Sequence, residues 1–395
     1  GLVCTADAPQ GSVLLEVPLS ACWTVEAARS HPDLAGLAAE TLPARDLLAL
    51  HLMLEAAAGA RSPRAAHVAS LPSVQEIGLP LVWAEAELLE GSEVHIECTK
   101  LREELPEDFA AMAAALDAAG LQHLLKSRGL GYADYLWARC IYWSRYMEFT
   151  EADGSHTMAL CPGVDMFNHS PAAPAGLFKL DRAAGTVAVT AGAEYKEGQQ
   201  AFINYKPNSW NDQLLLSFGF ALPGGQLAAS VITFSLQVSA AQLAAHTTLL
   251  AAEDAAATAA ARPAQHTVLH TPGPEALVAG GGTAELIMRH RLLPASPLPT
   301  ALLGMARIQH CTPGALAVQP EGGGPLGVHP LAPAVELRVL GFLHRLLSGK
   351  LDGFRSPPAA DREALANDAS IPPRRRYAAL LRAGERQALT AALEA

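Results

Sequence analysis

The sequence predicts an α+β fold, in which a β-rich region is split by a long helical insertion and followed by a helical domain. Strand-like segments lie at residues 1–25 and again at 158–237. Residues 26–150 carry apolar residues at helical spacing, and from about residue 240 the chain is rich in Ala and Leu. We therefore expect the 395 residues to form two domains.

The first β segment has two apolar runs, at residues 2–5 and 13–17, which flank a turn at 9–11. The chain begins with Gly1 inside the first of these runs. We therefore expect that the natural chain extends further upstream, where a targeting segment would not be visible.

The helical insertion is predicted from two segments. Residues 46–54 have apolar side chains at helical spacing, and residues 134–146 form a second such segment that is crowded with aromatic residues. We expect prolines to interrupt the helices of this region at Pro72, Pro80 and Pro106.

The second β segment includes two strand-like runs, at residues 177–180 and 186–190. Its turns are expected at Gly163, Gly185 and Gly198. Further on, helical periodicity returns at 335–347 and 374–393, while the Pro/Gly segments 272–274 and 322–325 are expected to be surface loops.

Composition excludes several classes of function. Half of the residues are hydrophobic and 17% are charged, which allows a large core. The net charge of −11 argues against non-specific nucleic-acid binding but is compatible with a basic protein as partner. No apolar run reaches the roughly 18 residues that a membrane span needs, so we expect no membrane partner.

Six cysteines are scattered through the chain without a CxxC pair. They predict neither a disulfide framework nor a zinc cluster, so we expect no metal. Buried free thiols are typical of a reducing intracellular compartment, which leaves cytoplasm, nucleus and plastid open. Nothing in the sequence indicates an oligomer, and we expect a monomer.

Two short segments carry most of the functional information. Residues 165–170 read Asp-Met-Phe-Asn-His-Ser, and residues 201–205 read Ala-Phe-Ile-Asn-Tyr. Together with residues 209–220 that follow, this order resembles the SET-domain protein methyltransferases. The resemblance implies that S-adenosylmethionine binds at the Asn-His-Ser segment and that the later strand ends in the active-site tyrosine.

Within that family the chain is most similar to the branch of the Rubisco large-subunit methyltransferase. Residues 1–18, 71–83, 143–145 and 377–386 carry the closer match. The resemblance implies a SET β fold (β-clip and pseudoknot) over residues 1–239 with a helical insertion at about 26–130. It also implies an all-α substrate-binding domain over 240–395.

Tyr205 is the expected catalytic residue. From the residues alone it could be a half-buried strand tyrosine that packs for bulk. The resemblance instead implies that its hydroxyl lies near the sulfonium, where it can orient the methyl group and hydrogen-bond the amine.

The resemblance also implies a set of cofactor-binding residues. Asn168 and His169 would contact the methionine and adenine ends, and Arg145 would bind the carboxylate, a task that suits a guanidinium fork. Main-chain contacts would come from Gly1 and Leu2, and Tyr205 completes the set. We expect the other histidines to be structural.

Four residues match positions near the incoming amine: Ser144, Met147, Asp165 and Phe218. Asp165 could equally cap the turn before Asn168. Phe218 stands where the Rubisco enzyme has a second tyrosine, and Met147 replaces an aromatic residue. Pro171 follows Asn-His-Ser, where histone-directed enzymes have a cysteine and a later zinc cluster, so the non-histone branch is favoured.

The leading hypothesis is therefore an S-adenosylmethionine-dependent protein-lysine N-methyltransferase that acts on a non-histone protein. A second hypothesis keeps the reaction and makes a protein histidine the acceptor. A third is a SET-like protein-binding module without turnover.

Overall fold

The computed structural model describes residues 1–38, 40–150, 156–224, 227–260, 263–271, 283–312, 328–366 and 371–395. The expected loops at 272–274 and 322–325 lie outside these residues. The described chain divides into two compact units. The first comprises residues 1–84, 97–209 and 213–220, and the second comprises residues 85–96, 210–212 and 221–395.

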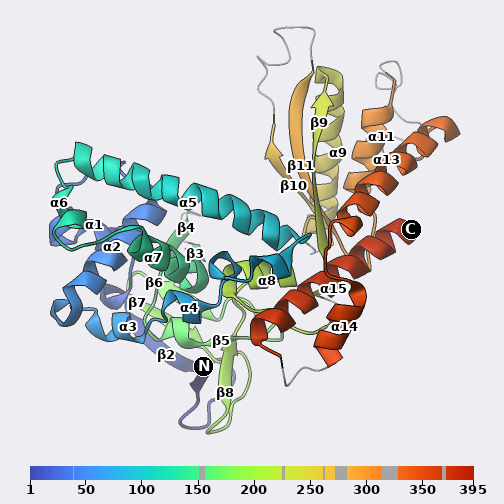
Figure 1. The fold of residues 1–395 in the computed structure, drawn as a ribbon. Helices are drawn as coiled ribbons and strands as arrows, with labels where there is room; N and C mark the ends of the chain where they lie inside the picture. Colours follow the sequence, from blue (N-terminus) through green and yellow to red (C-terminus); the bar gives the residue numbers. More distant parts are fainter. Residues whose placement is uncertain are drawn as a thin grey trace. The chain divides into compact units, whose positions relative to one another are not determined.

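The first unit contains three small sheets, with strand orders β1-β8-β5, β2-β7-β6 and β3-β4 (Figure 1). The strands are β1 (Leu2–Val3), β2 (Val13–Pro18), β3 (Met147–Thr150), β4 (His156–Ala159), β5 (Asn168–His169), β6 (Phe178–Asp181), β7 (Thr186–Thr190) and β8 (Gln200–Ile203). Strands β1 and β2 pair antiparallel with β8 and β7, which come much later in the chain. The helical insertion therefore splits a single β region, as predicted.

Strands β6 and β7 show why the sequence pattern was informative. Val187 and Val189 alternate with half-buried residues and are fully buried in the β core, and the hairpin turns at Gly185. Gly185 has a φ of 68°, a conformation that glycine adopts without steric cost. The turns predicted at Gly163 and Gly198 also have positive φ angles, of 81° and 78°.

The helices of the first unit follow one another between β2 and β3. They are α1 (Val25–Arg29), α2 (Ala44–Ala58), α3 (Ala65–Ser70), α4 (Val74–Ile77), α5 (Glu93–Ala118), α6 (His123–Lys126) and α7 (Tyr132–Arg145), and the first residues of α5 belong to the second unit. Helices α2 and α7 confirm the two segments predicted from apolar spacing.

The prediction that Pro106 interrupts a helix is wrong, because Pro106 lies inside helix α5. A proline inside a helix removes one main-chain hydrogen bond and crowds the preceding turn. Leu105 and Met112 on either side of it are each 1% exposed. Packing on both sides of the proline therefore offsets its local cost and lets the helix continue.

The second unit is not all-α, so the expectation of an all-α domain over residues 240–395 is wrong. It contains a three-stranded antiparallel sheet of order β10-β11-β9, formed by β9 (Ser230–Val238), β10 (His266–His270) and β11 (Ala284–Leu292). Strand β11 buries every second residue from Leu286 to Leu292. Strand β9 pairs with β11 along nine residues, which places 230–238 in the second unit.

Helices α9 (Ala240–Ala259) and α11 (Thr300–His310) pack on this sheet through a core that includes Leu249, Leu286 and Met305. Helices α13 (Pro333–Asp352) and α15 (Pro373–Glu394) confirm the two helices predicted near the C terminus, and α14 (Pro358–Ala366) lies between them in sequence. Among the described residues, no helix has the length and apolar character needed to cross a bilayer.

Candidate active site

Strands β5 and β8 bring the two informative motifs together. They pair in parallel, with Asn168 opposite Phe202 and His169 opposite Ile203. The amide of Ser170 continues the pairing by donating to the carbonyl of Ile203 at 3.0 Å. Tyr205 follows two residues after the end of β8, so it lies beside the Asn-His-Ser segment.

Tyr205 is held at both ends. Its amide donates to Nδ1 of His169 at 3.1 Å, and its hydroxyl donates to the carbonyl oxygen of Phe167 at 2.6 Å. Burial raises the pKa of Tyr205 to about 12, while Arg145 lowers it and Asp165 raises it by smaller amounts. The phenol therefore stays protonated near neutral pH, where it can orient a ligand but cannot act as a base.

Aromatic rings surround Tyr205 on several sides. The ring centroids of Phe218 and His169 lie 4.9 and 5.2 Å from that of Tyr205, and Phe220 lies 6.3 Å away. Phe220 was not predicted as a site residue, although it follows Phe218 by only two positions. These rings leave Tyr205 in an apolar wall, an environment that disfavours a charged amine.

Gly219 explains how Phe218 and Phe220 reach the same wall. Its φ is 79°, and a Cβ atom there would lie 2.8 Å from the carbonyl oxygen of Ile77. The helix α8 (Asn211–Phe218) ends at this tight approach to the backbone at Ile77 and Gly78. Only glycine fits both the conformation and the space.

His169 is neutral in this setting. Burial lowers its pKa to about 4, and its Nδ1 accepts the hydrogen bond from Tyr205, so the proton lies on Nε2. Phe220 packs against its ring at 5.7 Å. The residue thus fixes the main chain of Tyr205 and presents an uncharged imidazole.

Three of the predicted cofactor residues come together at the β1-β8-β5 sheet. Leu2 lies opposite Ala201 of β8, and Asn168 is opposite Phe202 on the other side of β8. Gly1 lies so close to Asn168 and Gln200 that a Cβ atom would be 2.5 Å from Nδ2 of Asn168. Asn168 is exposed and donates to Oε1 of Gln200 at 2.5 Å.

These are the predicted residues that could hold the amino-acid end of S-adenosylmethionine. The side chains of Gln200 and Asn168 approach the Cβ-free backbone at Gly1 closely, and the exposed carboxamide of Asn168 can both donate and accept. Arg145 at the end of α7 supplies a cation. Its Nη1 donates to the carbonyl oxygen of Asp165 at 3.1 Å and lies 3.3 Å from Oδ2 of that residue.

Asp165 is the most enclosed polar residue of the site, because its side chain has no solvent exposure. Its Oδ2 is approached by Arg145 and, at 3.2 Å, by Nε2 of His67 from helix α3. Neither contact caps the turn before Asn168, and the position of Asp165 near the incoming amine stays a prediction. His67 was not singled out from the sequence. It is one of the fourteen histidines of the chain and lies in an apolar helical segment.

The other two residues predicted near the amine, Ser144 and Met147, make local contacts. Ser144 donates to the carbonyl oxygen of Cys140 at 2.8 Å, one turn back in α7. Met147 is 6% exposed and lies in the β core with Phe149 and Ala159. The structure thus gives Met147 a packing role in the β core on which Tyr205 also packs, whereas Phe218 contacts the ring of Tyr205 directly.

Within the described ranges, no three His, Cys, Asp or Glu side chains are grouped so that they could hold a metal ion.

Comparisons with known proteins agree with this architecture. Residues 241–389 match the family described as Rubisco LSMT substrate-binding. A crystal structure of the SET domain of LSMT bound to lysine and AdoHcy aligns with a TM-score of 0.75 at 18% identity, covering 100% of this chain and 83% of that one. The corresponding complex with methyllysine aligns at 0.77 and 19% identity, covering 100% and 84%.

Rubisco LSMT bound to AdoMet is also similar, with a TM-score of 0.71 at 19% identity over 100% of this chain and 84% of that chain. No curated protein matches the sequence. The chain therefore has an LSMT-like SET fold, and its residues 241–389 match the LSMT substrate-binding family. At this level of identity the structural likeness concerns the fold.

Proposed function

Starting from this LSMT-like SET fold, we propose that the chain is an S-adenosylmethionine-dependent protein-lysine N-methyltransferase that acts on a non-histone protein. The single observation that carries the proposal is the setting of Tyr205. Its hydroxyl is fixed on the carbonyl oxygen of Phe167 inside an aromatic wall, next to the ion pair that the partly exposed Arg145 forms with the enclosed carboxylate of Asp165.

When bound, S-adenosylmethionine supplies an electrophilic methyl group on sulfur. Asn168, the main chain at Gly1 and Leu2, and the guanidinium of Arg145 would hold its amino-acid end, since charge-assisted hydrogen bonds suit that end. His169 is neutral and would pack beside it.

The acceptor must arrive as a neutral amine, although free lysine has a pKa of about 10.4. The rings of Phe218 and Phe220 exclude water around Tyr205, and an apolar surrounding disfavours the ammonium form. Asp165 would face the amine nitrogen and Tyr205 would orient it, while its proton leaves to water. Alignment of the two reactants supplies most of the rate enhancement.

The second unit would hold the protein substrate. A cavity of about 700 Å³ lies there, with apolar lining from Phe354 and Pro358 and polar lining from Asp352, Arg362 and Thr390. Support for this role comes from the family description matched by residues 241–389. A protein segment with mixed apolar and charged side chains is the occupant that we propose.

Transfer of a radiolabelled methyl group tests the proposal. The full chain is incubated with labelled S-adenosylmethionine and a heat-treated lysate of its own source, with Tyr205→Phe as the control. We expect labelled protein bands with the unaltered chain and almost none with the control. Binding of S-adenosylhomocysteine without any transfer would instead favour the binding-module hypothesis.

A further inference from the structure

A chain of buried contacts connects the helical insertion to the candidate site. Nε1 of Trp23 donates to Nδ1 of His67 at 2.8 Å, and Nε2 of His67 lies 3.2 Å from Oδ2 of Asp165. Arg145 approaches the same Oδ2 at 3.3 Å from helix α7. The side chain of His67 is 6% exposed and that of Asp165 is 0% exposed, so water does not compete for these contacts.

The partners determine the protonation of His67. An indole nitrogen can only donate, so Nδ1 of His67 must be an acceptor and carries no proton. A neutral ring then has its proton on Nε2, which donates to Asp165. A cationic ring would bring two donors face to face at the 2.8 Å contact with Trp23. His67 is therefore a neutral donor with one fixed tautomer.

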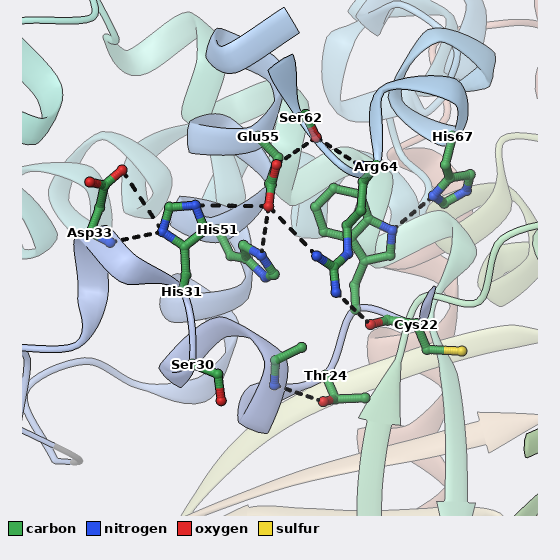
Figure 2. A network of polar contacts seen from close by, with 12 residues as sticks. Cys22, Thr24, Ser30, His31, Asp33, His51, Glu55, Ser62, Arg64 and His67 are labelled. Atoms are coloured by element: carbon green, nitrogen blue, oxygen red, sulfur yellow. Dashed lines mark hydrogen bonds and ion pairs between the residues drawn. The ribbon is translucent and has the colours of Figure 1, made fainter. Parts of the chain in front are cut away.

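Trp23 is itself firmly anchored. It is fully buried, and its main chain exchanges two hydrogen bonds with Leu160, at 2.9 and 3.1 Å. The guanidinium of Arg64 lies 5.1 Å from the centre of the Trp23 ring. Arg64 forms an ion pair with Glu55, and the hydroxyl of Ser62 donates a hydrogen bond to the same carboxylate (Figure 2). The indole thus offers His67 a donor whose position is set by both the β region and the insertion.

As a result, the two carboxylate oxygens of Asp165 have different hydrogen-bonding partners. Oδ2 has two partners, His67 and Arg145, whereas Oδ1 is buried and has no hydrogen-bond partner among the described residues. A buried acceptor without a partner is costly, which makes it a place where a ligand donor is favoured. Asp165 also precedes by two residues Phe167, the acceptor of the Tyr205 hydroxyl.

We infer that His67 is a positioning residue, which together with Trp23 orients the Asp165 carboxylate so that Oδ1 is kept for the nitrogen of the methyl acceptor. The inference rests on the proposed function, because it takes the acceptor to be an amine at this site. It adds a determinant of acceptor binding that lies outside the two SET motifs, in the helical insertion.

The test is the affinity for free L-lysine, measured by calorimetry on the full chain saturated with S-adenosylhomocysteine. His67→Leu removes the donor to Asp165 and should weaken lysine binding about tenfold or more, since hydrogen bonds to charged groups are strong. His67→Gln retains one donor and one acceptor and should stay within about threefold of the unaltered protein. Affinity for S-adenosylhomocysteine should be unchanged in both.

His51→Leu is the matched control. His51 is a fully buried histidine of the same insertion and packs on the Trp23 ring at 5.1 Å. Its Nε2 lies 3.6 Å from Oε1 of Glu55, but neither ring nitrogen forms a hydrogen bond among the described residues. Its replacement should leave lysine affinity unaltered. Equal lysine binding by His67→Leu and the unaltered protein would overturn the inference while the proposed function stands. No lysine binding by the unaltered protein would overturn both.

A second measurement does not depend on a stable leucine variant. Long-range proton–nitrogen spectra of ¹⁵N-histidine-labelled protein, with the His67 signal assigned by its loss in His67→Gln, report the tautomer directly. We expect a neutral ring with its proton on Nε2. A cationic ring, or a proton on Nδ1, would refute the orientation that the inference requires.

Discussion

The main-chain amide of Tyr205 donates to Nδ1 of His169 at 3.1 Å, and the two rings lie 5.2 Å apart. This bond joins Tyr205, two residues after the end of β8, to the last residue of β5. Because the imidazole must accept here, it is neutral and cannot swing away without leaving a main-chain donor unpaired. The relationship explains how two motifs more than thirty residues apart form one site.

The first prediction concerns the hydroxyl of Tyr205. Tyr205→Phe removes the bond to the carbonyl oxygen of Phe167 but keeps the ring contacts with Phe218 and His169. We expect an unchanged circular dichroism spectrum and methyl transfer lowered by about 100-fold, the usual cost of losing one oriented donor in an active site. An unimpaired initial rate on a verified substrate would remove Tyr205 from the chemistry.

The second prediction concerns the cofactor corner. Asn168→Ala should weaken S-adenosylhomocysteine binding about tenfold in a calorimetric titration, because a hydrogen bond to a charged ligand group is lost. Arg145→Ala should weaken it too, but this change also leaves the buried Asp165 without its cation.

Asn208→Gly is the control for that titration. Asn208 is exposed and has a φ of 57°, so glycine suits its backbone. If Asn168→Ala and Arg145→Ala both bind as tightly as this control, the cofactor lies elsewhere.

The third prediction concerns Phe218. Its ring is 4.9 Å from that of Tyr205, so Phe218→Tyr adds a hydroxyl to the wall around the amine. The added group takes space and offers a hydrogen bond to a less methylated nitrogen. Mass spectrometry should show fewer methyl groups per lysine, with a smaller change for Phe220→Tyr, whose ring is 6.3 Å away. An unaltered product distribution would show that Phe218 does not border the acceptor.

The fourth prediction concerns acid stability of the second unit. His246 and His290 are fully buried, and burial lowers their pKa values to about 4 and about 3. The unfolded chain takes up these protons near pH 6.5, so stability is complete above that pH and is lost as the pH falls. At pH 5 each histidine costs about 2 kcal/mol relative to pH 7.

Thermal unfolding between pH 8 and pH 5 tests this dependence. The decrease in Tm should be smaller in His246→Leu than in the unaltered protein, and unchanged in His270→Gln, because His270 is exposed on β10. Parallel pH curves for all three proteins would contradict the role of the buried histidines.

The fifth prediction concerns the cavity in the second unit. Thr390 lines it and is exposed on α15, so Thr390→Trp should fill the space without disturbing the core. Methylation of the intact protein substrate should fall about tenfold, whereas binding of S-adenosylhomocysteine and of free lysine should not change. Full methylation of the protein substrate by this variant would place docking elsewhere.

Local sequence patterns predicted elements that bury either alternate residues or one continuous apolar stretch. Strand β7 alternates around Val187 and Val189, and α2 buries a continuous stretch from Asp46 to Glu55. Strands β10 and β11 were missed because an Ala- and Leu-rich region suggests helices, although β11 alternates over Leu286, Met288 and Leu292. Pro106 was misjudged because tertiary packing outweighed its local cost.

For a similar reason, the sequence predicted some residues of the candidate site and missed others. Tyr205, Asn168 and His169 lie in short motifs that the resemblance made visible, and parallel pairing of β5 with β8 brings them together. His67 and Phe220 carry no motif. Their importance arises from contacts made across the fold, with Asp165 and with Tyr205, which no local spacing encodes.

The identity of the methylated residue tests the central claim most directly. Protein labelled by the full chain with S-adenosylmethionine carrying a radioactive methyl group is hydrolysed, and the amino acids are separated. The account predicts label in Nε-methylated lysine, dependent on the Tyr205 hydroxyl. Label in methylhistidine, or no label that exceeds the Tyr205→Phe control, would contradict it.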